Sequence, residues 1–181
     1  MLRLKAILKN RLKGARRLAI LGIGSELRAD DAAGVFIARG LQAYIKKKRQ
    51  RPRSDYDKAG PGRAMGASVK VFLGETAPEN LTGEIKKFKP THLIIIDAID
   101  SKSEAGTVSL FDAGEEDGVS FSTHRMPIKI IKDYLCKSIG CETVIIGIQP
   151  QSLDFSAALS PKVRRSAKMV AGAITEALKI P

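Results

Sequence analysis

Short apolar runs and longer amphipathic stretches alternate along the chain. Runs with the length and residue types of strands lie at residues 18–22, 68–73, 93–96, 107–111 and 143–148. Between them, apolar residues recur at helical spacing at residues 31–45, 78–88, 127–138 and 161–178. The predicted order is therefore β-α-β-α-β-β-α-β-α. This alternation predicts an α/β fold in three layers, with helices on both faces of a mostly parallel, twisted sheet.

The length of 181 residues fits one domain of ordinary size. We expect an α/β domain over residues 18–181, preceded by a basic extension at residues 1–17. A stretch rich in Lys, Arg, Pro and Gly at about residues 46–66 has no hydrophobic periodicity. It predicts a basic loop within the domain.

The net charge of +12 lies in these basic segments. Residues 1–17 hold seven basic and no acidic side chains, and residues 46–63 hold eight basic and two acidic ones, so the rest of the chain is nearly neutral. Such charge suits a basic nucleic-acid-binding α/β protein, which is our alternative function, with an affinity that depends strongly on salt. A solvated loop and a frayed basic helix account for the same charge, and we expect no nucleic-acid partner.

The basic extension also carries an apolar stripe at helical spacing, formed by Met1, Leu4, Leu8 and Leu12. Flanked by Lys and Arg, this stripe suits docking on an acidic partner or on a membrane surface. It suits packing against its own domain or a neighbouring subunit equally well. The sequence leaves these roles open.

Compartment signals point to the cytoplasm. No apolar run is long enough to cross a bilayer, and no signal-peptide apolar region follows the basic N-terminus. Cys136 and Cys141 are too few for a disulfide framework, and their spacing matches neither a zinc ribbon nor a redox pair. We therefore expect reduced, mostly buried thiols.

Polar residues follow several of the predicted strands. In a sheet of this kind, ligands bind beyond the carboxyl ends of the strands. Two carboxylates and an imidazole form a set that transition metals accept. Five side chains are candidates for this rim, and they are Asp30, Asp31, Glu75, Asp97 and His124.

Asp97 has the strongest local argument, because it directly follows the apolar residues of a predicted strand. Asp30 and Asp31 both suit the N-cap of the next helix, and we favour Asp30 as the cap and Asp31 as the site residue. Capping preferences permit the reverse. Glu26 is a supporting group in the same loop, and His92, which opens a strand, is expected to be half buried.

Familiar motifs for other chemistry are absent. Gly22 and Gly24 begin like a dinucleotide-binding loop, but Leu27 stands in the place of the third glycine. The chain has no Gly-x-Ser-x-Gly elbow, no His-Glu-x-x-His helix and no Gly-Lys-Ser/Thr phosphate loop. Nucleotide binding and those hydrolase classes are therefore not indicated.

Four motifs in one order carry a family resemblance: GIGSELRADDAAG after the first strand, GETAPEN after the second, LIIIDAID at the third, and STH before the next helix. From about Leu18 to the C-terminus, the chain resembles the nickel-iron hydrogenase maturation endopeptidases. It particularly resembles the branch that processes membrane-bound, energy-converting hydrogenases. The resemblance implies a phosphorylase/hydrolase-like twisted sheet between helices and a hydrolase that acts on a peptide bond.

The resemblance also implies a reaction and a site. Members remove a C-terminal extension from a hydrogenase large-subunit precursor after nickel has been inserted. By motif position, the implied nickel contacts and catalytic residues are Asp31, Asp97 and His124. The metal arrives with the substrate, so no tightly bound cofactor is implied. Ser25 departs from the family, in which asparagine is usual at this place.

Overall fold

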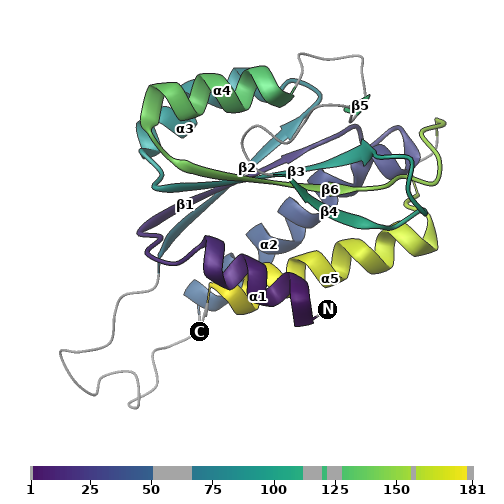
Figure 1. Ribbon diagram of the computed structural model, residues 1–181, viewed down its shortest axis with the longest axis horizontal. Coiled ribbons are helices and arrows are strands. Elements are labelled where there is room, and N and C mark those ends of the chain that lie inside the picture. Colours follow the sequence, from purple (N-terminus) through teal and green to yellow (C-terminus); the bar gives the residue numbers. More distant parts are fainter. Residues whose placement is uncertain (1, 51–66, 112–119, 122–127, 156–157, 179–181) are drawn as a thin grey trace.

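A computed structural model describes residues 2–50, 67–111, 120–121, 128–155 and 158–178. A sheet in the strand order β2-β1-β3-β6-β4 runs through its centre, with β5 paired to β3 (Figure 1). The strands span Arg17–Ile23 (β1), Ser68–Glu75 (β2), His92–Asp100 (β3), Val108–Phe111 (β4), Ser120–Phe121 (β5) and Glu142–Ile148 (β6). Strands β1, β2, β3 and β6 are parallel, whereas β4 runs antiparallel to β6. The predicted α/β class is confirmed.

Helices cover both faces of the sheet. They span Leu2–Arg11 (α1), Ala33–Arg49 (α2), Thr82–Phe88 (α3), Ile128–Ile139 (α4) and Pro161–Ala177 (α5), and short 3₁₀ turns Ala29–Ala32 (η1) and Pro78–Leu81 (η3) precede α2 and α3. Helices α1, α2 and α5 lie on one face, and α3 and α4 lie on the other (Figure 1). Each predicted helix is present.

Alternate residues of the strands supply two separate apolar layers, because successive side chains of a strand point to opposite faces. In β3, Ile94 and Ile96 pack with α2 and α5, while Leu93 and Ile95 pack with α3 and α4. Burial of β3 on both faces explains why its sequence is a continuous apolar run.

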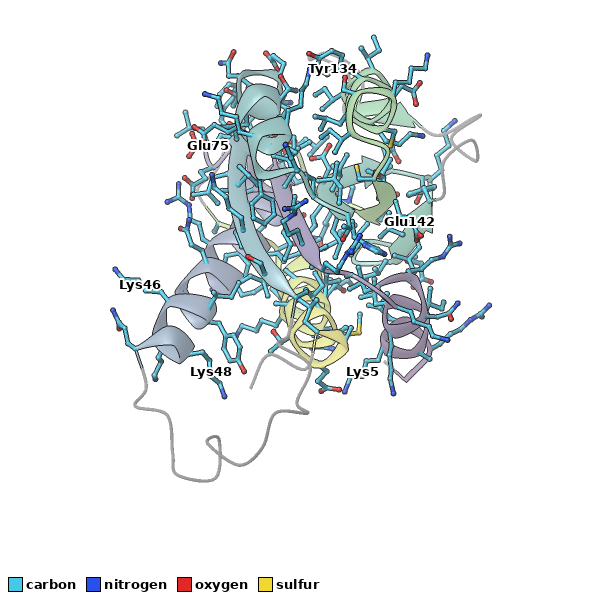
Figure 2. All side chains as sticks on the ribbon, turned by 90° about the vertical axis from the view of Figure 1, so that its left-hand side faces the viewer. Lys5, Lys46, Lys48, Glu75, Tyr134 and Glu142 are labelled. Carbon is cyan, nitrogen blue, oxygen red and sulfur yellow. The ribbon has the colours of Figure 1, made fainter. Side chains whose placement is uncertain are left out.

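Two predicted boundaries were wrong by at least three residues. Helix α2 does not end at Ile45 but continues to Arg49 and carries Lys46 and Lys48 (Figure 2). Their long side chains suit a helix as well as a loop, and so hydrophobic periodicity alone ends the helix too early. Strand β3 does not end at Asp97 but continues to Asp100, because β5 pairs with Ile99 and Asp100. The rest of the predicted basic loop, residues 51–66, lies outside the described residues.

The N-terminal helix packs against its own domain. Leu8 is fully buried and Leu12 is 8% exposed, both within the layer that includes α5. Lys5 Nζ also lies 2.6 Å from Glu176 Oε1 on α5. The sequence left several roles open for the apolar stripe, and Leu8 and Leu12 serve the one in which the stripe packs against its own domain.

No helix within the described residues is long and apolar enough to span a membrane.

Candidate functional site

Glycines bring the loop after β1 close to the carboxyl end of β3. A Cβ added to Gly34 would overlap the carbonyl oxygens of Ile96 and Ile23, and one added to Gly24 would overlap the carbonyl oxygen of Asp31. Gly24 also has a φ of 133°, which L side chains rarely adopt. These contacts pack η1 and the start of α2 directly against the strand that carries Asp97.

Asp31 lies on η1 and is 5% exposed. Its Oδ2 accepts a hydrogen bond of 2.8 Å from the backbone N–H of Ser25. The backbone N–H of Arg28 in turn donates to the Ser25 carbonyl oxygen at 3.2 Å. Ser25 therefore holds the loop through its main chain.

Asp30 does not cap a helix, and that prediction was wrong. The residues at the N-caps of η1 and α2 are Arg28 and Ala32, and neither end has a side-chain cap. Asp30 is instead fully buried and accepts hydrogen bonds from three backbone N–H groups of the segment between β6 and α5. The donors are Gln151 at 2.8 Å, Ser152 at 3.2 Å and Ser160 at 2.6 Å. Asp30 therefore links the loop after β1 to the segment between β6 and α5 at the carboxyl edge of the sheet.

Asp97 lies within β3, opposite Gly147 of β6, and is 3% exposed. Beyond it, the ends of the two strands are joined by polar bonds. Gln149 donates to Asp100 at 3.1 Å and accepts from the backbone N–H of Ser101 at 2.8 Å. A backbone N–H from Lys102 and the Gln149 side chain hold the pKa of Asp100 below its ordinary value.

His124 lies outside the described residues, so its position relative to Asp31 and Asp97 stays a prediction. Strand β5, which the sequence did not predict, ends three residues before it at Phe121. Because Phe121 pairs with Ile99, β5 lies at the same end of β3 as Asp97.

The two glutamates of the rim make ion pairs. Arg39 Nη2 on α2 lies 2.6 Å from Glu26 Oε2 and 3.2 Å from Glu75 Oε1. All three side chains are about half exposed, and pairs of this kind contribute little to stability. Their effect is to connect the loop after β1, the end of β2 and helix α2.

Sequence reasoning missed an apolar part of the same rim. Leu27 is 69% exposed in the loop after β1, and Phe155 is 87% exposed in the segment after β6. Arg28 links the two segments, since its Nε donates to the Leu153 carbonyl oxygen at 3.0 Å and its guanidinium lies 6.0 Å from the Phe155 ring centroid. No local pattern relates residues so far apart in sequence.

Asp31 and Asp97 are thus two buried carboxylates on neighbouring elements at the carboxyl edge. Within the ranges that the structure describes, no three His, Cys, Asp or Glu side chains are grouped so as to hold a metal ion. A third protein ligand would have to come from elsewhere, and the segment with His124 is the candidate that the sequence names.

Comparison with known proteins decides the family. The family model described as hydrogenase maturation protease matches residues 56–177. The chain belongs to the hydrogenase maturation proteases. This protease is accordingly a hydrolase that acts on a peptide bond, as the four motifs indicated.

Individual relatives of this protease cover most of its length. A protein of Methanocaldococcus jannaschii assigned to the same proteases is 31% identical over 176 residues, which are 97% of this chain and 96% of the relative. The hydrogenase 3 maturation protease of Escherichia coli is 26% identical over 83% of this chain and 84% of its own. Among solved structures, the hydrogenase maturation protease HycI from Thermococcus kodakarensis aligns with a TM-score of 0.76 and 29% identity over 96% of this chain and 99% of that one.

Proposed function

We propose that this protease removes a C-terminal extension from the large-subunit precursor of a nickel-iron hydrogenase after nickel has been inserted. The names of its relatives supply the substrate class, because a maturation protease acts on a hydrogenase before the enzyme is complete. The observation that carries the proposal is the placement of two buried carboxylates, Asp31 and Asp97, on packed elements at the ligand-binding edge of the sheet.

Asp31, Asp97 and His124 are the proposed contacts to nickel, which is part of the substrate. Carboxylate oxygens and an imidazole nitrogen are ligands that divalent nickel accepts. Burial supports this role for the two aspartates, because the attraction between a carboxylate and a cation is stronger in a low-dielectric site than in water. The protein needs no resident cofactor in this scheme.

Chain length supports the inclusion of His124. A segment of three residues spans at most about 11 Å. His124 follows Phe121 by three residues, and Phe121 pairs with Ile99, only two residues beyond Asp97. The imidazole is therefore within reach of the same edge.

In the proposed reaction, the protease would recognise loaded precursor by binding the nickel, and that binding would position the nearby scissile peptide bond. Holding the reactants in the right geometry can lower the barrier by several kcal/mol, on the order of 7–11 in well-oriented model reactions. The backbone hydrogen bond from Ser25 to Asp31, and the packing of Gly34 against β3, would keep the two carboxylates in place without further ordering on binding.

The proposal is tested with three variants, Asp31→Asn, Asp97→Asn and His124→Ala. Each is expected to lower cleavage of nickel-loaded precursor at least about a hundredfold while the unfolding midpoint stays near that of the wild type. Intact mass of the precursor measures loss of the extension. The matched control is Asp133→Asn on α4, a half-exposed aspartate that should leave processing unchanged. Cleavage at the wild-type rate by all three variants, or equal cleavage of nickel-free precursor, contradicts the proposal.

A further inference from the structure

A second group of reactive side chains lies at the opposite edge of the sheet. His92 and Glu142 face each other at the amino ends of β3 and β6, whereas Asp97 lies near the carboxyl ends. Here a half-open hollow of about 490 Å³ is lined by residues that include Arg11, His92, Cys136, Cys141 and Thr143. Figure 2 looks onto this edge, with Glu142 between α4, which carries Tyr134, and α1, which carries Lys5.

A tight turn brings the two cysteines together. Cys136 lies in the last turn of α4, and Cys141 lies directly before β6. Gly140 reverses the chain with a φ of 69°, and its N–H donates to the Cys136 carbonyl oxygen at 2.8 Å. Both thiols lie near one hydroxyl: Thr143 Oγ1 is 3.1 Å from the Cys136 Sγ and 3.7 Å from the Cys141 Sγ.

The two thiols differ in acidity. A hydrogen bond from Cys141 lowers the pKa of Cys136, and Thr143 and Lys132 act in the same direction, against burial and Asp133. The same hydrogen bond, together with burial, raises the pKa of Cys141. Ionisation is therefore favoured at Cys136, the more exposed of the two thiols, over Cys141.

The hollow offers a polar wall beside these thiols. His92 is 5% exposed, so the expectation of half burial was wrong, because β3 begins between β1 and β6. Its Nε2 is buried, has no hydrogen-bond partner within the described part of the chain and lies 3.6 Å from Glu142 Oε2. A buried ring nitrogen of this kind suits a small polar ligand.

We propose that Cys136 and Cys141 form a redox-active dithiol, which a peroxide entering this hollow converts reversibly into a disulfide. The Cys136 thiolate attacks one peroxide oxygen, the O–O bond breaks, and hydroxide leaves, which gives a sulfenic acid at Cys136. The Cys141 thiol then attacks that sulfur and forms the S–S bond. The hydroxyl leaves with the Cys141 proton as water, and the hydroxide of the first step takes up the proton that Cys136 lost on ionisation. Two thiols are thereby oxidised to a disulfide, and one peroxide is reduced to two waters.

A metal site is the competing interpretation of these cysteines. Zinc sites need about four ligands, and three or more His, Cys, Asp or Glu side chains would have to converge. The described residues contain no such group. A disulfide needs only two neighbouring sulfur atoms, and the two Sγ atoms here both lie near the Thr143 hydroxyl. The geometry therefore favours redox chemistry.

The direct test treats reduced, full-length protein with hydrogen peroxide and then alkylates the remaining thiols. We expect the wild type to lose the mass of two hydrogen atoms and both alkylation sites, and dithiothreitol to restore both without unfolding the protein. Oxygen addition without the loss of hydrogen, or two thiols that remain free to alkylate, overturns the proposal.

Two variants assign the roles. Cys141→Ser removes the second thiol, so Cys136 should instead gain one and then two or three oxygen atoms. Cys136→Ser should react with peroxide at least about tenfold more slowly than the wild type, since the more acidic thiol is gone. Reaction of Cys136→Ser at the wild-type rate overturns the proposal.

One measurement needs no variant. In the wild-type protein, brief alkylation near neutral pH followed by peptide mapping should label Cys136 well before Cys141, and the Cys136 rate should reach half its maximum below the ordinary thiol pKa of about 8.5. Equal labelling of the two cysteines contradicts the proposed division of roles. The pH dependence of labelling also reflects the charged and titratable side chains around the two cysteines, which are Lys132 and Asp133 on α4, Arg11 on α1, His92 on β3 and Glu142 on β6.

Discussion

At the scale of single residues, the site depends on places where a side chain is missing. Gly34 lets the first turn of α2 touch the backbone of β1 and β3, and Gly24 lets the preceding loop fold back on Asp31. Protein interiors are packed so closely that an extra methyl group at such a contact forces the backbone apart. That contact packs the start of α2, directly after η1 with Asp31, against β3 with Asp97.

Substitution of Gly34 tests this packing. Gly34→Ala would place a Cβ on the carbonyl oxygens of Ile96 and Ile23, so we expect a loss of about 3 kcal/mol or more in the free energy of unfolding. Chemical denaturation measures it.

The matched control is Gly40→Ala, in the same helix, where nothing lies within 4 Å of an added Cβ. Alanine is the better helix former, and this variant should gain about 0.5–1 kcal/mol. If both substitutions had the same effect on stability, close packing at Gly34 would not be the reason for its glycine.

Asp30 shows where residue-level prediction reached its limit. An aspartate before a helix is a good capping residue on local grounds. In the folded chain its carboxylate accepts hydrogen bonds from the backbone N–H groups of Gln151, Ser152 and Ser160, which lie more than a hundred positions away. The local sequence does not indicate these distant partners. Helix capping was therefore predicted for Asp30, and its link between two loops was not.

At the scale of elements, apolar patterns predicted helices α2, α3, α4 and α5 and each strand of the parallel sheet, because every one of them buries a face. Strand β5 was not predicted, because it has only two residues and forms by pairing with β3 beyond Asp97. Helix α1 was predicted only as an apolar stripe at helical spacing in a basic segment, and what this stripe contacts was left open. Its leucines complete the layer formed by α2 and α5.

Removal of one side chain measures how far α1 belongs to the domain. Leu8 is fully buried, and Leu8→Ala should lower the free energy of unfolding by about 3 kcal/mol through lost burial and the cavity left behind. Urea denaturation of the whole chain gives the value.

Arg3→Ala supplies the comparison on the same helix, because Arg3 is exposed and should change stability by less than about 0.5 kcal/mol. A Leu8 variant as stable as the Arg3 variant would mean that α1 contributes nothing to the core.

At the scale of the whole molecule, the sheet separates two kinds of chemistry. Its carboxyl edge carries Asp31 and Asp97 with the apolar rim of Leu27 and Phe155, and its amino edge carries the proposed dithiol. Exposed apolar side chains beside a site are common where another protein docks. In the proposed function, the partner at that rim is the hydrogenase precursor.

Docking of the precursor can be separated from its cleavage. Phe155→Ser should raise KM for the precursor about tenfold, with kcat nearly unchanged, because the lost contact is made equally in the bound and transition states. Tyr134→Ser on α4, an exposed aromatic on the face opposite α2, is the control and should leave both constants unchanged. An unchanged KM for the Phe155 variant would remove the rim from the docking surface while leaving the role of the aspartates untouched.

The sequence by itself determined the fold class, the order of the main elements and the family, because local residue patterns indicate which faces are buried and contain the ordered motifs. Tertiary structure alone decided which aspartate ties loops together, that Asp97 lies inside a longer strand, and that Cys136 and Cys141 share one hydroxyl. Each of these depends on atoms from distant segments, whose approach is set by packing of the sheet and its helices. Periodicity reports which side of an element is buried, whereas only the folded chain specifies what lies against it.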